Sequence, residues 1–205
     1  MTQINQGIIM KALDYCYDKA VNGLPGLATA EDMANDYSGA DRPMSDNARS
    51  LVRWQVAKSS TSGFITGLGG IITLPVAIPA NITSVLYVQT RMIAAIAIMG
   101  KYDIRNDKVK TLVYMCLCGT AMMDTVKGVG IQIGSKLTVK AINSISRATI
   151  NKINQAVGFR LVTKFGQTGV VNLSKAVPFL GGVIGGTVDG VATKSIGTVA
   201  IKTFL

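Results

Sequence analysis

Histidine is absent from this chain of 205 residues, and glutamate occurs once, at Glu31. Without an imidazole, Ser-His-Asp and Cys-His catalysis are excluded, because both use histidine as the general base. The lack of histidine also argues against a zinc site, since three cysteines alone supply too few ligands. Side chains suited to ordinary hydrolytic acid–base chemistry are scarce. We therefore expect a protein that is not an enzyme and that holds no metal or other cofactor.

Cysteine is also rare, at Cys16, Cys116 and Cys118, and no two of these have the Cys-x-x-Cys spacing. This usage is typical of a reduced, intracellular compartment. The first residues contain neither the basic segment nor the apolar stretch of a secretory signal, so we expect a cytoplasmic protein. Charged residues make up 16% of the sequence and hydrophobic residues 48%. Because soluble domains usually contain ~25% charged residues, this chain is more apolar than most.

The charge that is present is distributed unevenly. Residues 1–46 contain seven acids and three bases, whereas the remaining residues contain four acids and eighteen bases. No acid occurs between Asp124 and Asp189. A long region of one sign predicts an anionic partner. We divide the chain accordingly into an acidic N-terminal helical extension with its linker, residues 1–44, and an α-helical domain, residues 45–205.

Hydrophobic periodicity predicts an all-α fold, a compact multi-helix domain whose apolar helices are kinked at glycine and proline. Thr29 and Asp32 form a capping box that opens a short helix. Ser45 or Asp46 is expected to cap the next one, and Asn106 or Asp107 a later one. The other predicted helices begin near Ile8 and Lys136, and the main boundaries are expected at 8–22, 80–99, 106–123 and 136–154, with a last helix ending near 204.

Two apolar, glycine-rich segments, 63–79 and 177–190, interrupt this pattern. Neither contains a P-loop or a complete dinucleotide-binding fingerprint. Glycines four residues apart remove side chains from one helix face and let two helices pass closely. We therefore predict hinges and close packing at Gly63, Gly67, Pro75, Pro79, Gly182, Gly186 and Gly190.

These segments carry a family resemblance. Residues 67–79, followed by 88–97 and by Gly100-Lys-Tyr-Asp103, resemble the signature region of the EcsC protein family. Residues 177–189 are similar to that family's second block. The resemblance covers roughly 45–204. It implies membership of a mainly bacterial family and supplies no catalytic residue that can be transferred to this chain.

Gln89 and Arg91 lie in the predicted apolar helix 80–99. Because an unpaired buried charge is costly, we predict that Arg91 forms a structural ion pair, with Asp124 or Asp189 as its partner. A ligand or ion site and a surface position are the alternatives. The window between Lys58 and Arg91 contains no charged residue and is long enough to span a bilayer. Its prolines and glycines fit a kinked hairpin buried in protein equally well.

The basic region offers the main functional signal. In one continuous helix, Lys136, Lys140 and Arg147 would share a stripe, and a cationic amphipathic helix binds an anionic membrane surface. A simply solvated face is the alternative. Nucleic acid is disfavoured because residues 136–154 contain no interleaved aromatic residue. The predicted membrane-binding residues are Lys136, Lys140, Arg147, Lys152, Arg160 and Lys164.

Our leading hypothesis is a non-enzymatic, peripherally membrane-associated accessory or interaction protein that docks through these bases. One alternative is a membrane-inserting protein, either pore-forming or regulatory, whose glycine and proline hinges let buried helices swing out. Another is a carrier of a small hydrophobic ligand in an apolar cavity. The sequence identifies no protein partner.

Overall fold

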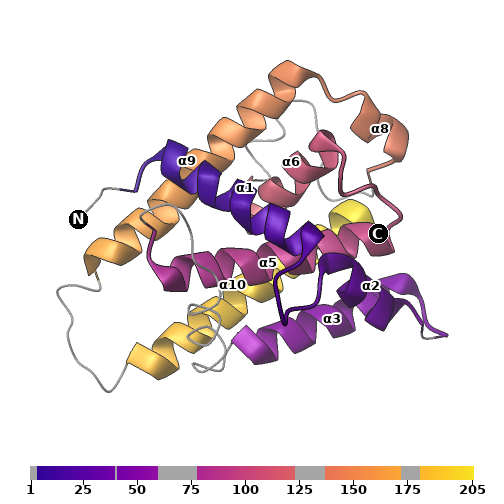
Figure 1. The fold of residues 1–205 in the computed structure, drawn as a ribbon, viewed down its shortest axis with the longest axis horizontal. Coiled ribbons are helices and arrows are strands. Elements are labelled where there is room, and N and C mark those ends of the chain that lie inside the picture. The colour runs from indigo at the N-terminus through magenta and orange to yellow at the C-terminus, as the bar shows by residue number, and fades with distance from the viewer. Residues whose placement is uncertain (1–3, 40, 60–77, 123–136, 172–180) are drawn as a thin grey trace.

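The computed structural model describes residues 4–39, 41–59, 78–122, 137–171 and 181–205, and these form helices without any strand (Figure 1). The all-α prediction is thus confirmed. In chain order the elements are α1 (Gln6–Asn22), α2 (Ala30–Ser38), α3 (Met44–Ser59), α5 (Ala80–Met99), α6 (Asp107–Cys116), the 3-10 helix η1 (Gly119–Met122), α8 (Val139–Asn143), α9 (Arg147–Val171) and α10 (Gly181–Phe204).

Helix α5 forms the centre of the molecule, with α1, α2, α3, α6 and α10 packed around it (Figure 1). Every residue from Leu86 to Ala97 is buried, including the polar Gln89, Thr90 and Arg91, as expected for a helix that has no continuous polar face. Its window Ile82–Met99 is long and apolar enough to cross a membrane, yet 89% of that window is buried within the protein. The surrounding helices therefore already cover the surface that a bilayer would otherwise cover.

Local signals fix several helix ends where the sequence predicts them. The Thr29 hydroxyl accepts from the Asp32 amide at 3.0 Å, and the Asp32 carboxylate accepts from the Thr29 amide at 2.9 Å, which completes the capping box. Helix α1 ends before Gly23, whose φ of 93° favours glycine. Helix α5 spans Ala80–Met99 and stops at Gly100.

Two other predicted boundaries were wrong. Helix α3 begins at Met44, directly after Pro43, so Asp46 lies in its first turn and pairs with Arg49 at 2.8 Å instead of capping the helix. Helix α6 ends at Cys116 and not at Met123. Gly119 has a φ of 60°, a left-handed conformation that no α-helix continues through.

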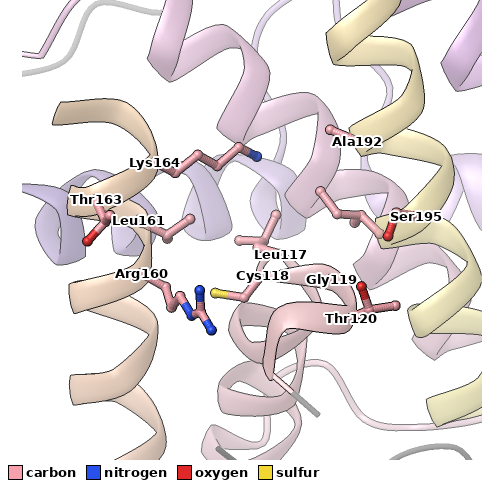
Figure 2. Close-up of a pocket in the computed structure, with 11 residues that line it drawn as sticks. Leu117, Cys118, Gly119, Thr120, Arg160, Leu161, Thr163, Lys164, Ala192 and Ser195 are labelled. Atoms are coloured by element: carbon pink, nitrogen blue, oxygen red, sulfur yellow. The ribbon is translucent and has the colours of Figure 1, made fainter. Parts of the chain in front are cut away.

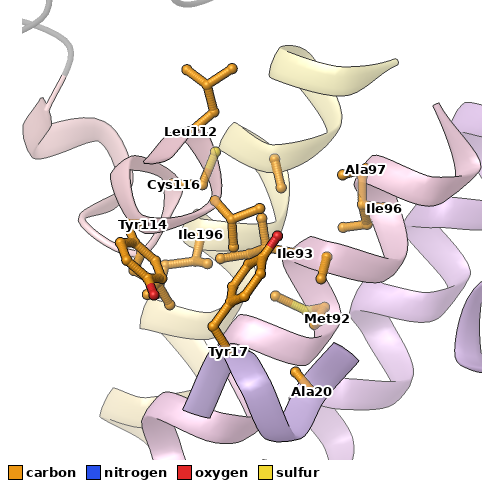
Figure 3. Close-up of a cluster of buried hydrophobic side chains, with 14 of the residues drawn as sticks. Tyr17, Ala20, Met92, Ile93, Ile96, Ala97, Leu112, Tyr114, Cys116 and Ile196 are labelled. Atoms are coloured by element: carbon orange, nitrogen blue, oxygen red, sulfur yellow. The ribbon is translucent and has the colours of Figure 1, made fainter. Parts of the chain in front are cut away.

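The core includes the N-terminal helices. Tyr17 of α1 packs edge-on against Tyr114 of α6, with ring centroids 5.7 Å apart, and both rings lie beside Ile93 and Ile196 (Figure 3). The Tyr17 hydroxyl also donates to the carbonyl of Ile104. The described residues before and after position 44 therefore share one hydrophobic core, although the N-terminal segment has a net negative charge and the rest of the chain a net positive charge.

Candidate anion-binding site

Helix α9 presents a buried stripe and a basic exposed side. Its buried residues recur every four positions and face α1 and α6: Ile153, Val157, Leu161 and Phe165. Four of the predicted membrane-binding residues are exposed on it: Arg147, Lys152, Arg160 and Lys164. Phe159 is also exposed, at 65%. Phe159 is not among the predicted membrane-binding residues. Its spacing of seven residues from Lys152 places the two side chains on one helix face, and this spacing is the signal in the sequence.

The basic stripe predicted over residues 136–154 does not form one helix. Helix α8 ends at Asn143, and the hydroxyl of Ser146 accepts from the amide of Thr149 at 3.1 Å as α9 begins. Serine side chains compete in this way with a continuing helix. Lys140 and Arg147 are therefore exposed on two different helices, while Lys136 lies outside the described residues.

A cavity of about 340 Å³ opens between η1, the second half of α9 and α10 (Figure 2). Arg160 and Lys164 line it from α9, and both side chains extend toward η1 and α10. Being four residues apart on one helix, they lie on neighbouring turns of the same side. Of the described residues that line the cavity, none is acidic. Both bases are among the predicted membrane-binding residues, but their spacing alone does not indicate a cavity.

Hydroxyl groups face these cations from the other wall. Thr120 of η1 and Ser195 of α10 line the cavity there, and both hydroxyls lie near Gly119 in Figure 2. A Cβ atom on Gly119 would approach the Ser195 Oγ to 3.2 Å. The left-handed turn at Gly119 therefore has two consequences. It prevents α6 from continuing, and it brings η1 close to α10.

Cys118 lines the same cavity, with its sulfur atom facing Arg160 (Figure 2). Burial raises the pKa of this thiol to about 12, and the positive charges of Lys164 and Arg160 oppose that rise. The group is consequently a neutral thiol near pH 7, and it is not an activated nucleophile, which would need a lowered pKa.

Gln89 and Arg91 are 2% and 5% exposed, respectively. The Gln89 amide donates to the Thr193 hydroxyl at 3.1 Å, linking α5 to α10. Arg91 donates to the carbonyl of Ala28 at 2.8 Å, and its guanidinium lies 5.2 Å from the centre of the Tyr87 ring. Within the described residues its partners are thus a carbonyl and a ring. Asp124 and the side chain of Asp189 lie outside them, so pairing with either stays a prediction.

The predicted hinges lie mostly at or beyond the limits of the described residues. Gly63, Gly67 and Pro75 lie outside them, as do the surroundings of Gly182 and Gly186 in α10. Pro79 stands immediately before α5, and Gly190 is buried in α10.

A close contact that sequence analysis missed occurs at Gly197, where a Cβ atom would lie 2.5 Å from Val52 Cγ2. The signal was the row Gly190, Thr193 and Gly197, which puts small residues on one face of α10.

Comparison with models of known protein families gives a match over most of the chain. The model of the EcsC protein family matches residues 13–205. The chain belongs to the EcsC family. No curated protein and no solved structure matches it. The EcsC match begins within α1 and includes α2, so it extends further toward the N-terminus than the resemblance seen in the sequence.

Two residues within the range matched by the EcsC model, Gly100 and Tyr102, have a clear packing role. A Cβ atom on Gly100 would lie 2.3 Å from the backbone oxygen of Phe204. Tyr102 packs against the Phe204 ring, with centroids 5.4 Å apart, and its hydroxyl donates to the carbonyl of Leu137. Gly100 and Tyr102 therefore hold the end of α5 against the end of α10.

Proposed function

We propose that this EcsC-family protein is a non-enzymatic accessory protein that docks on an anionic, cytoplasmic membrane surface through the exposed side of α9. The observation that carries the proposal is the exposure of Phe159, at 65%, beside exposed bases of the same helix. Lys152 shares its face, and Arg160 is its neighbour in the chain. An exposed aromatic ring among cations suits the headgroup region, where the ring reaches apolar atoms and the bases meet phosphate.

The expected strength is that of reversible attachment. Each base held near an anionic surface contributes ~1 kcal/mol. Burying the Phe159 side chain adds a further ~1.5–3 kcal/mol at most. The four bases of α9 and this ring together suffice for docking that responds to salt, because exposed charges are screened by ions. Trp54 is exposed as well, at 52%, but Lys58 lies over its ring at 5.2 Å.

The arrangement of charge would orient the protein on such a surface. Helix α2 carries Glu31, Asp32 and Asp36 and no base, whereas α9 carries four bases and no acid. The two helices lie on opposite sides of α5 (Figure 1). A molecule with this asymmetry approaches an anionic surface with its basic side first.

Vesicle flotation tests the proposal directly. We expect the protein to float with phosphatidylglycerol vesicles and not with phosphatidylcholine vesicles, and to release no trapped dye. The triple variant Arg147→Glu, Lys152→Glu, Arg160→Glu should lose flotation. A matched control reverses three exposed bases on other elements, Arg53→Glu, Arg105→Glu and Lys202→Glu, and should float as the wild type does.

Three results would overturn the proposal. Equal loss in both triple variants would mean that net charge, and not α9, governs binding. Wild-type flotation that survives about 0.5 M salt, where the Debye length falls to a few Å, would mean apolar attachment. Dye release would favour membrane insertion.

A further inference from the structure

We infer that the cavity between η1, α9 and α10 binds a phosphate-bearing anion, which Arg160 and Lys164 hold. The inference deepens the proposed function and rests on it for one point only, that the phosphate belongs to a lipid headgroup. The alternative source is a soluble phosphate compound. The chemistry of recognition is the same for both.

The size of the cavity fits a small organic anion. Its volume of about 340 Å³ falls at the lower end of the roughly 300–1,000 Å³ typical of small-molecule sites. Leu117, Leu161 and Ile196 form its apolar floor, and the partly buried Ala192 lies at its side. A ligand of this size can therefore place its phosphate against the two bases, with any short apolar portion beside Ala192.

The polar groups of the cavity match the needs of phosphate. The planar guanidinium of Arg160 can donate two parallel hydrogen bonds to phosphate oxygens, and the ammonium of Lys164 adds a compact positive charge. The hydroxyls of Thr120 and Ser195 can donate from the opposite wall. The neutral Cys118 thiol adds no repulsion. A concave site lined by two cations also concentrates anions more strongly than a flat surface with the same cations does.

Titration of the full-length protein with inorganic phosphate and with dihexanoyl phosphatidic acid, below its micelle concentration, tests the inference. The variant Arg160→Gln, Lys164→Gln should weaken binding of the organic phosphate at least about tenfold. The variant Arg147→Gln, Lys152→Gln removes the same charge from the same helix outside the cavity. It should weaken vesicle docking but change soluble binding by no more than about twofold. Ala192→Leu fills the cavity without changing charge and should also abolish soluble binding.

Cys118 provides a second readout. It is the partly exposed cysteine, whereas Cys16 and Cys116 are buried. Phosphatidic acid bound in the cavity should slow the alkylation of Cys118 by N-ethylmaleimide, with the other two cysteines as internal references. The double glutamine variant at Arg160 and Lys164 should lose this protection, which shows that the ligand occupies the cavity even if Ala192→Leu does not fold.

The possible outcomes separate this inference from the proposed function. Absence of binding and of protection by either soluble phosphate overturns the inference, and flotation would then still support docking. Equal weakening in the two glutamine variants also overturns it, because a diffuse charge would explain both. Soluble binding without flotation supports the cavity and overturns membrane docking. Preference for the lipid analogue over inorganic phosphate identifies a headgroup, and equal affinity identifies a soluble phosphate.

Discussion

At the scale of single residues, Arg91 is a cation placed almost wholly inside the protein, where its guanidinium connects the central helix to the start of α2. It donates to the carbonyl of Ala28, directly before the capping box of that helix. A hydrogen bond from a charged donor contributes ~1.5–3 kcal/mol, and the contact with the Tyr87 ring adds to it.

We predict that Arg91→Ala lowers the free energy of unfolding by about 2 kcal/mol or more, because it removes the hydrogen bond and leaves a cavity. Urea denaturation followed by circular dichroism measures the change. Arg105→Ala is the control, since Arg105 is exposed, and it should lie within about 0.5 kcal/mol of the wild type. Equal stability of the two variants would show that the Arg91 contacts contribute nothing.

Cys118 allows a prediction on pH. Because burial raises its pKa to about 12 from 9.0, the thiolate fraction at neutral pH is very small. The alkylation rate should rise about tenfold per pH unit between about pH 8 and 10, as the thiolate is the reactive form. An ordinary thiol would level off near pH 9.

Mass spectrometry of labelled peptides gives the rate at Cys118. Arg160 and Lys164 lower this pKa, so the variant Arg160→Gln, Lys164→Gln should react more slowly than the wild type at every pH in this range. A rate that levels off near pH 9 in the wild type would contradict the raised pKa of the thiol.

At the scale of helices, the contact of α3 with α10 depends on the missing side chain of Gly197. Both Cγ atoms of Val52 lie within 2.6 Å of the position that a Cβ atom would occupy. Rotation of the Val52 side chain cannot fully relieve such a clash, because every staggered rotamer leaves at least one methyl group near that position.

We predict that Gly197→Ala destabilises the protein, since the overpacking cost of ~1–3 kcal/mol exceeds the helix-propensity gain of at most ~1 kcal/mol. Adding Val52→Ala should recover part of the loss, which a double-mutant cycle measures. Gly158→Ala is the matched control in α9, where the nearest atom lies 3.4 Å from the new Cβ atom, and it should stabilise. Gly197→Ala with a raised melting temperature would disprove the close contact.

The helices also show what sequence can and cannot predict. The bounds of α5 and the capping box of α2 follow from neighbouring residues, so local patterns suffice. The break between α8 and α9 depends on competition between the Ser146 side chain and a continuing helix, and periodicity alone favoured continuity. The cavity joins Cys118, Arg160 and Ser195 through tertiary packing, and no local pattern in the sequence brings these three residues together.

At the scale of the whole molecule, peripheral docking and membrane insertion differ in what happens to α5. Its composition would permit a span, but in the folded protein its surface is covered by other helices. Insertion would require α1 to separate from α5, and this interface contains a natural reporter. The Cys16 thiol donates to the carbonyl of Thr83 at 3.7 Å, and Cys16 is completely buried.

We predict that Cys16 stays protected from N-ethylmaleimide when the protein is bound to phosphatidylglycerol vesicles, and that the amides of α5 keep their slow hydrogen exchange. Docking through α9 leaves the contact of α1 with α5 intact, so neither signal should change between the soluble and bound states. Protein unfolded in urea provides the reference for full labelling. Rapid labelling of Cys16 on vesicles, accompanied by dye release, would mean that the core opens at the membrane. Membrane attachment would then depend on helices released at the glycine and proline hinges, and not on the basic side of α9.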